Sequence, residues 1–283
     1  MDSNKFIFRN CLPQILSSIR VISKIGLPQP SFKLNQTKGI VQGSYTLDSA
    51  DNTKIQFIKK GASTKGRVIF IHGTPGNAIN WIDFINAAPE NIEYISISRL
   101  GYNPGQGFKP QTSFAKQVEA IEPLLEPVGD KYPIVVGHSM GATLALKIAI
   151  LYPNRVSAVV PISGAFSPEL EKIYQIQYFA DKYLYYFLPP SYRVSNRELL
   201  AFPEELRIMN EELGNIRDPI LFIHGDEDYL VPYENLKYIT ERLPQTSVLD
   251  AITLKGVDHF VIWRKTDFVI NIIRQLSDKF WGM

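Results

Sequence analysis

Runs of apolar residues divide most of this chain into short strands and amphipathic helices. Polar and apolar residues alternate over 44–47 and 54–59, which predicts a β-hairpin that turns at Asp51-Asn52. Continuous apolar runs follow, and these are typical of strands buried on both faces of a parallel sheet. Together with a last strand near the C-terminus, the expected strands cover residues 67–71, 94–98, 134–136, 158–162, 219–223 and 248–254.

Helical patterns occupy the segments between these strands. We expect helices at residues 79–88, 113–125, 142–150, 233–243 and 265–280, with Ser113 as the cap of the second. Strands that alternate with helices indicate right-handed crossovers. The pattern therefore predicts an α/β fold in which a mostly parallel central sheet carries helices on both faces.

The alternation of strand and helix stops after Gly164. No buried strand is expected in residues 166–215, which are helical in pattern and divided by Pro189-Pro190 and by Pro203. The segment is rich in aromatic residues: Tyr174, Tyr178, Phe179, Tyr183, Tyr185, Tyr186, Phe187 and Tyr192. We expect a helical insertion, and we expect most of these rings to pack it onto the core.

The N-terminal residues have a different pattern. Residues 6–25 combine apolar positions with basic ones, and Arg9 and Arg20 interrupt any run long enough to span a membrane. No small-residue cleavage site follows a clean apolar core, which argues against a secretory signal. We expect an amphipathic helix that packs on the body of the protein. The alternative is contact of residues 1–27 with a membrane surface or a partner.

Composition excludes several classes of function. The chain has 283 residues, of which 45% are hydrophobic and 20% charged, and its formal net charge is +2, too balanced for a nucleic-acid-binding protein. Cys11 is the single cysteine, so it has no partner for an internal disulfide and no cysteine-based metal site is expected. We expect a cytoplasmic protein, peripheral at a membrane if the N-terminal alternative holds.

The candidate chemistry begins where the strand at 134–136 ends. Gly137-His138-Ser139-Met140-Gly141 follows it directly, and a helical pattern starts at once behind. A Gly-x-Ser-x-Gly pentapeptide between strand and helix predicts a tight turn that presents the serine hydroxyl at the end of the strand. The two glycines leave room for neighbouring backbone. Ser139 is therefore the candidate nucleophile.

Four motifs follow one another along the chain: His-Gly-x-x-Gly at 72–76, Gly-x-Ser-x-Gly at 137–141, Gly-x-x-Asp-x-x-Val-Pro from Gly225, and Gly-x-x-His at 256–259. Their order resembles that of the α/β-hydrolase fold family, in its lidded esterase, lipase and C–C hydrolase branch. The resemblance covers residues 43–283. It implies an N-terminal segment at 1–40, a first core part at 41–163, a lid at 164–215 and a second core part at 216–283.

A serine hydroxyl needs an adjacent base, and in this fold the acid and then the histidine follow the nucleophile along the chain. His259 alone among the four histidines lies beyond a candidate acid. His72 and His224 end strands and are interpreted as structural, and the side chain of His138 is expected to point away from the serine. His259 is therefore the expected base.

Two aspartates follow the strand at 219–223. The spacing of the family motif selects Asp228 as the carboxylate that orients the histidine, and it leaves Asp226 as a turn residue that bonds local backbone. Asp258 is interpreted as a solvated loop charge. The loop 99–105 resembles the family's turn after its fourth strand, although Leu100 and Asn103-Pro104 depart from the commoner sequence.

An oxyanion needs two preorganised N–H donors. The resemblance assigns them to the main chain of Met140 and Thr74, the alternative for Thr74 being a plain turn residue. Tyr178 and Tyr183 of the expected lid are the candidate substrate contacts. No metal or organic cofactor is implied.

The sequence thus predicts a serine hydrolase that cleaves a small-molecule carboxylic ester through an acyl-enzyme. A C–C bond hydrolase with the same residues is one alternative, and a non-catalytic binding scaffold of this fold is another. The oligomeric state and the identity of the substrate do not follow from the sequence.

Overall fold

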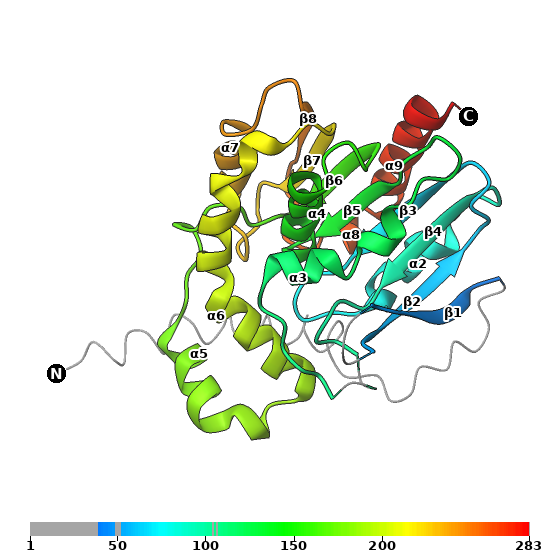
Figure 1. Ribbon diagram of the computed structural model, residues 1–283. Coiled ribbons are helices and arrows are strands. Elements are labelled where there is room, and N and C mark those ends of the chain that lie inside the picture. The colour runs from blue at the N-terminus through cyan, green and yellow to red at the C-terminus, as the bar shows by residue number, and fades with distance from the viewer. Residues whose placement is uncertain (1–38, 49–51, 104, 106, 283) are drawn as a thin grey trace. The chain divides into compact units, whose positions relative to one another are not determined.

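The computed structural model describes residues 39–48, 52–103, 105 and 107–282. An eight-stranded sheet organises them, with the strand order β1-β2-β4-β3-β5-β6-β7-β8 (Figure 1). The strands are β1 (Val41–Thr46), β2 (Lys54–Lys60), β3 (Gly66–Ile71), β4 (Ile92–Ile97), β5 (Ile134–His138), β6 (Ala158–Ile162), β7 (Ile220–Gly225) and β8 (Val248–Leu254). Only the pairs β1–β2 and β2–β4 are antiparallel. The expected mostly parallel sheet is confirmed.

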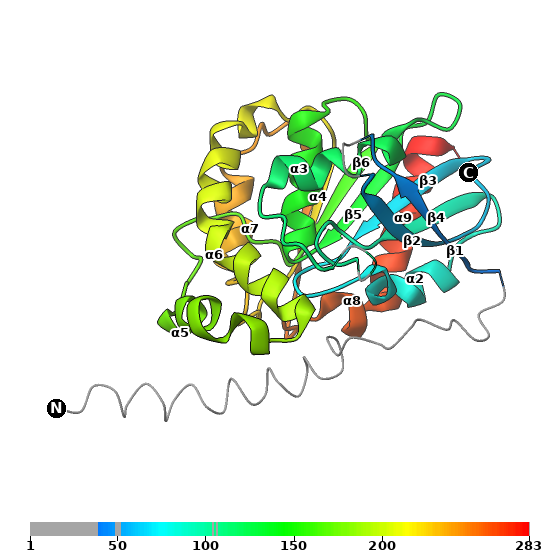
Figure 2. The same ribbon diagram turned by 60° about the horizontal axis from the view of Figure 1, so that its bottom comes forward.

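Helices cover both faces of the sheet, as the sequence predicts. Helices α3 (Phe114–Glu119) and α4 (Met140–Leu151) lie on one face, and α2 (Ile82–Asn86) and α9 (Thr266–Trp281) lie on the other (Figures 1 and 2). Every residue of α4 from Met140 to Ile150 is buried. Near-complete burial of this helix fixes the turn before it against the sheet. The short helices α7 (Glu234–Thr240) and α8 (Val261–Arg264) complete the body.

Six chain segments meet where the parallel strands end, along the carboxyl edge of the sheet. Because β3 to β8 run in the same direction, the residues that follow their carboxyl ends meet there. Ligand and catalytic sites of open α/β sheets form at this edge. The segments carrying Thr74, Ser139, Asp228 and His259 are all among those six.

The helix expected at 113–125 is not continuous in the structure. It divides into α3 and the 3-10 helix η3 (Glu122–Leu125), because Pro123 has no N–H to continue the α-helical ladder. Ser113 occupies the N-cap position of α3, yet its side chain makes no capping hydrogen bond. The carboxylate of Glu205 accepts from the main-chain N–H of Phe114 at 2.7 Å instead. The cap of α3 therefore comes from a distant helix.

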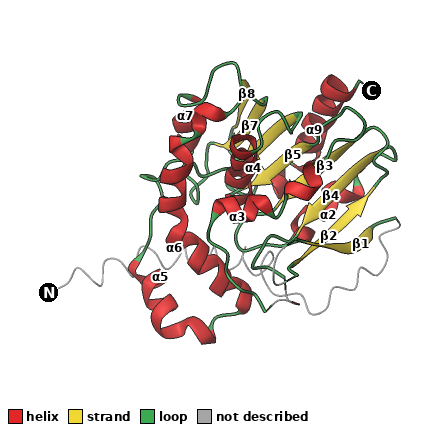
Figure 3. Cartoon of the chain, viewed as in Figure 1, coloured by secondary structure: helices red, strands yellow, loops and turns green. Residues whose placement is uncertain are grey.

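The segment after β6 contains helices and no strand, as expected (Figure 3). Its elements are α5 (Gln175–Phe179), the π-helix η4 (Ala180–Leu184), the 3-10 helix η5 (Tyr185–Phe187), α6 (Pro190–Glu211) and the 3-10 helix η6 (Leu213–Asn215). The prediction that Pro203 divides the segment is wrong, because α6 continues through it. Packing of Phe202 and Leu206 against the core offsets the hydrogen bond that Pro203 cannot make.

The expectation that the aromatic residues pack the insertion onto the core is wrong for six of the eight. These six side chains are exposed: Tyr174, Tyr178, Phe179, Tyr183, Tyr186 and Phe187. Each of the elements α5, η4 and η5 is short, and they contact one another and α6. Among the described residues, no other element covers the outer face of this single layer of short helices, so these rings are exposed there.

Residues 1–38, 49–51, 104, 106 and 283 lie outside the described residues, and several predictions fall on them. These predictions are the N-terminal amphipathic helix, the membrane contact of residues 1–27 and the exact turn of the first hairpin. Among the residues that are described, no helix is long and apolar enough to cross a membrane.

Candidate active site

The turn between β5 and α4 holds Ser139 in a strained conformation. Its φ is 56° and its ψ is −127°, a region that a residue with a side chain rarely adopts and that costs about 1–3 kcal/mol. The main-chain N–H of Ser139 donates to the carbonyl of Ile162 at 2.9 Å. The serine side chain remains partly exposed at the edge of the sheet, between a buried strand and a buried helix. The predicted strand-to-helix turn is confirmed.

The two glycines of the pentapeptide make room for backbone. A Cβ on Gly137 would lie 2.0 Å from the carbonyl oxygen of Gly141, and a Cβ on Gly141 would lie 2.2 Å from that of Ile71. Neither contact can be relieved by rotating a side chain, since both partners are main-chain atoms. The close approach that these positions require is therefore the reason for glycine.

Asp228 and His259 are in direct contact although 31 residues separate them. Nδ1 of His259 lies 2.7 Å from Oδ2 of Asp228, and both residues are buried. Nδ1 must donate, because a carboxylate only accepts, which leaves Nε2 as the nitrogen able to take a proton. The pair therefore has the tautomer that a general base needs.

The carboxylate of Asp228 is held at both oxygens. Oδ1 accepts from the main-chain N–H groups of Leu230 and Val231 at 3.0 and 2.8 Å, and Nε2 of His224 lies 3.3 Å from Oδ2. Burial alone would raise the pKa of Asp228, but the hydrogen bonds from His224 and His259 outweigh it and lower the pKa below its usual range. Asp228 therefore remains ionised beside the imidazole.

His138 links the serine turn to the histidine loop. Its Nε2 lies 2.8 Å from the main-chain carbonyl of His259, and the two rings are 4.8 Å apart between centroids. Burial, followed by the neighbouring His259, lowers the pKa of His138 to about 3. The ring is neutral at pH 7 and donates from Nε2, so it has a structural role.

The other two histidines, which were interpreted as structural, are also bonded to main-chain atoms. Nε2 of His72 accepts from the N–H of Arg99 at 3.0 Å, and Nδ1 donates to the carbonyl of Gly73 at 2.7 Å. Burial is the main reason that the pKa of His72 is well below its usual value. Nε2 of His224 lies 3.1 Å from the carbonyl of Val231.

The loop at 72–76 lies against the serine. A Cβ built on Gly73 would be 2.9 Å from Cβ and 3.4 Å from Oγ of Ser139. Thr74, the next residue, therefore lies close to the serine, and Met140 follows Ser139 as the first residue of α4. The structure brings the two predicted donor residues to the same side of the sheet as Ser139.

The two remaining aspartates differ from their predicted surroundings. Oδ1 of Asp226 accepts from the N–H of Gly256 at 2.7 Å, so it bonds the backbone of a loop 30 residues away. Asp258 is not a solvated charge: its two oxygens bind Arg264 at 2.7 and 2.6 Å, and only 17% of its side chain is exposed. Both residues brace the loop that carries His259.

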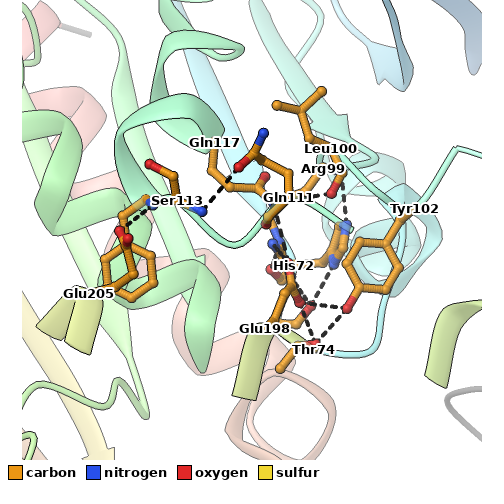
Figure 4. A network of polar contacts seen from close by, with 12 residues as sticks. His72, Thr74, Arg99, Leu100, Tyr102, Gln111, Ser113, Gln117, Glu198 and Glu205 are labelled. Atoms are coloured by element: carbon orange, nitrogen blue, oxygen red, sulfur yellow. Dashed lines mark hydrogen bonds and ion pairs between the residues drawn. The ribbon is translucent and has the colours of Figure 1, made fainter. Parts of the chain in front are cut away.

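A buried ion pair that the sequence pattern does not predict lies beside this site. Arg99 follows β4, and Glu198 lies on α6; NH1 of Arg99 is 2.7 Å from Oε1 of Glu198 (Figure 4). The side chains are 0% and 2% exposed. Although burial opposes it, the charge of Glu198 raises the pKa of Arg99, so the guanidinium stays protonated. The loop after β4 is thus bonded to the helical insertion.

A signal for Glu198 was present in the sequence. The buried residues of α6 recur at helical spacing, and Glu198 stands between Val194 and Phe202 in that stripe. A charge in the middle of an apolar stripe requires a buried partner. The pattern does not show which of the chain's 30 basic residues supplies it.

Tyr178 and Tyr183, the predicted substrate contacts, lie on α5 and η4 and are 52% and 58% exposed. Their role remains a prediction. No group of three or more His, Cys, Asp or Glu residues that could hold a metal ion occurs within the described parts of the chain.

Comparison with known proteins identifies the α/β-hydrolase fold. A family model described as alpha/beta hydrolase fold matches residues 66–202. A Haemophilus influenzae protein named "Putative esterase/lipase" is 26% identical over 243 residues, which cover 75% of this chain and 83% of that protein. The Mycobacterium tuberculosis protein named Lipase LipV is 30% identical over 116 residues, which cover 41% of this chain and 44% of the other.

Solved structures share the fold at low sequence identity. A monoacylglycerol lipase of Paleococcus ferrophilus matches with a TM-score of 0.63 and 19% identity, over 80% of this chain and 99% of that one. A structure described as a membrane phospholipase A matches with a TM-score of 0.64 and 18% identity, over 99% and 96% of the two chains.

Proposed function

We propose that this chain, which has the α/β-hydrolase fold, is a serine hydrolase of carboxylic esters. The contact of Asp228 with Nδ1 of His259 at 2.7 Å, at the same edge of the sheet as Ser139, carries the proposal. Similarity to esterases and lipases supports the substrate class.

The proposed reaction begins with attack of Ser139 Oγ on the ester carbonyl. His259 accepts the hydroxyl proton at Nε2 and returns it to the leaving alcohol, while ionised Asp228 stabilises the imidazolium. The main-chain N–H groups of Thr74 and Met140 bind the oxyanion of the tetrahedral intermediate. Water then attacks the acyl-enzyme with the same base, and the carboxylic acid leaves.

We propose that the insertion at 164–215 is the lid of this site and that its chain folds over the carboxyl edge of the sheet. Helix α6 supports this because it contributes Glu198 to the loop beside Ser139. Tyr178 and Tyr183 are proposed substrate contacts on the outer part of the lid.

Hydrolysis of p-nitrophenyl esters with acyl chains of increasing length tests the proposal. Wild-type protein should hydrolyse these esters, and the Ser139→Ala variant should not. Ser163→Ala is the matched control, because Ser163 directly follows the neighbouring strand β6, also has a positive φ of 48° and is fully buried. The acyl chain length with the highest kcat/KM indicates the length of the acyl pocket.

Labelling with a fluorophosphonate separates the alternatives. Labelling of Ser139 without ester turnover would favour a C–C bond hydrolase. Equal inertness of wild type and Ser139→Ala in both assays would contradict a serine hydrolase and favour a binding scaffold.

A further inference from the structure

The carboxylate of Glu198 accepts hydrogen bonds from two segments at once, the loop after β3 and the loop after β4. Oε1 and Oε2 accept from NH1 and NH2 of Arg99 at 2.7 and 3.2 Å. Oε2 also accepts from the hydroxyls of Thr74 and Tyr102, each at 2.6 Å (Figure 4). Glu198 is 3% exposed, so these bonds form in a region from which water is excluded. Charge-assisted hydrogen bonds of this kind are strong and geometrically specific.

Arg99 holds the same loop from its other side. Its Nε donates to the carbonyl of His72 and its NH2 donates to the carbonyl of Gly73, both at 3.0 Å. The guanidinium therefore fixes two consecutive carbonyls, and Glu198 fixes the hydroxyl of the residue that follows. Residues 72–74 are restrained at three successive positions by one ion pair.

From this geometry we infer that Glu198 is a positioning residue. From helix α6 of the proposed lid it orients residues 72–76, here called the oxyanion loop. The inference rests on the proposed function, in which the main-chain N–H of Thr74 binds the oxyanion. Oxyanion donors act because they are preorganised, and displacement of a reacting group by about 1 Å can cost about 10²-fold in rate. A hydroxyl anchored to a buried carboxylate limits the rotation of the Thr74 peptide.

The ion pair also fixes the lid. Helix α6 cannot leave the sheet edge without exposing Glu198 and leaving Arg99 buried without its counter-charge. The oxyanion loop is therefore complete only while α6 is docked. Any opening of the lid must involve the outer elements α5, η4 and η5 rather than α6.

The test uses variants that change the anchor and not the proposed donors. Glu198→Gln removes the charge and keeps the shape. Thr74→Val removes the hydroxyl and leaves the ion pair intact, and Thr74→Ser restores it. Glu93→Gln is the matched control, because Glu93 is 4% exposed and binds Lys59 and Arg67 at the opposite end of β4.

The first readout is the bimolecular rate at which a fluorophosphonate labels Ser139, since phosphonylation places an oxyanion in the same site. Glu198→Gln and Thr74→Val should be about tenfold slower or more, and Thr74→Ser should regain most of the rate. With p-nitrophenyl esters kcat should fall while KM changes little. Glu93→Gln should lose thermal stability and keep the labelling rate.

The second readout is hydrogen exchange of a peptide that covers residues 72–78. Its exchange should accelerate in Glu198→Gln and Thr74→Val and stay unchanged in Glu93→Gln. Wild-type labelling rates in folded Glu198→Gln and Thr74→Val would overturn the inference while the serine mechanism stands. If Glu198→Gln does not fold, the Thr74 pair decides. An unlabelled wild type would overturn the proposed function, and the positioning role with it.

Discussion

His138 and His259 are joined by a hydrogen bond of 2.8 Å from a ring nitrogen to a main-chain carbonyl. A carbonyl only accepts, so the proton lies on Nε2 of His138. The residue before the proposed nucleophile thus holds the backbone of the proposed base. The serine turn and the histidine loop are separated by 121 residues, and this bond fixes their relative position.

Replacement of His138 by Phe keeps an aromatic ring and removes the donor. The buried carbonyl of His259 then has no partner, which should lower the free energy of unfolding by about 1–3 kcal/mol. Displacement of His259 should lower kcat by roughly tenfold to a hundredfold. Urea unfolding and ester kinetics measure the two effects. Wild-type kcat in folded His138→Phe would refute the positioning role.

Asp228→Asn and Asp258→Asn should differ sharply in activity. An amide at 228 favours the wrong histidine tautomer, so kcat should fall by about 10³- to 10⁴-fold. Asp258 binds the largely exposed Arg264, and such pairs contribute little, so Asp258→Asn should keep kcat close to wild type. The reverse order of activities would assign the acid to Asp258.

The stability that ionised Asp228 contributes should depend on pH. Its pKa in the folded protein is below the value of about 3.9 expected for the unfolded chain. A lowered folded-state pKa gives stability that is present above about pH 4 and is lost as the pH falls toward the folded-state pKa. The difference in unfolding free energy between wild type and Asp228→Asn should therefore shrink below about pH 4. Denaturant titrations from pH 6 to pH 3 measure it, and a constant difference would contradict the assignment.

Two glycine substitutions should separate folding from activity. In Gly141→Ala the new methyl meets the main-chain oxygen of Ile71 at 2.2 Å, and we expect a loss of more than about 4 kcal/mol or no folded protein. In Gly73→Ala the methyl meets Cβ of Ser139 at 2.9 Å and the main-chain oxygen of His138 at 3.2 Å, a milder overlap that a small shift of the loop can relieve. Gly73→Ala should remain folded and lose at least about tenfold in kcat. Thermal unfolding and ester kinetics distinguish the two, and full activity in Gly73→Ala would show that the loop can retreat.

The exposed aromatic residues of the insertion should contribute little to stability. Tyr186 and Phe187 are 87% and 85% exposed, so replacing both with Ser should change the free energy of unfolding by no more than about 0.5 kcal/mol. Phe202 is 3% exposed, and Phe202→Ala should cost about 3–5 kcal/mol. A large loss in the double variant would show that these rings are covered in solution.

Several features of the protein follow from the sequence because they depend on neighbouring residues. Apolar runs gave the strands of the sheet, and strand-then-glycine patterns located Ser139 and Asp228 at strand ends. The carboxyl ends of parallel strands meet at the same end of the sheet. Motifs that follow such strands could therefore be predicted to lie close together.

Other features were decided only by the tertiary structure. The partner of Glu198 is 99 residues away, and no local pattern distinguishes Arg99 from the other basic residues. The exposure of Tyr178 and Phe187 depends on whether another layer covers the insertion. Local sequence sets the period and ends of an element through backbone geometry, whereas burial and charge pairing depend on which elements meet in three dimensions.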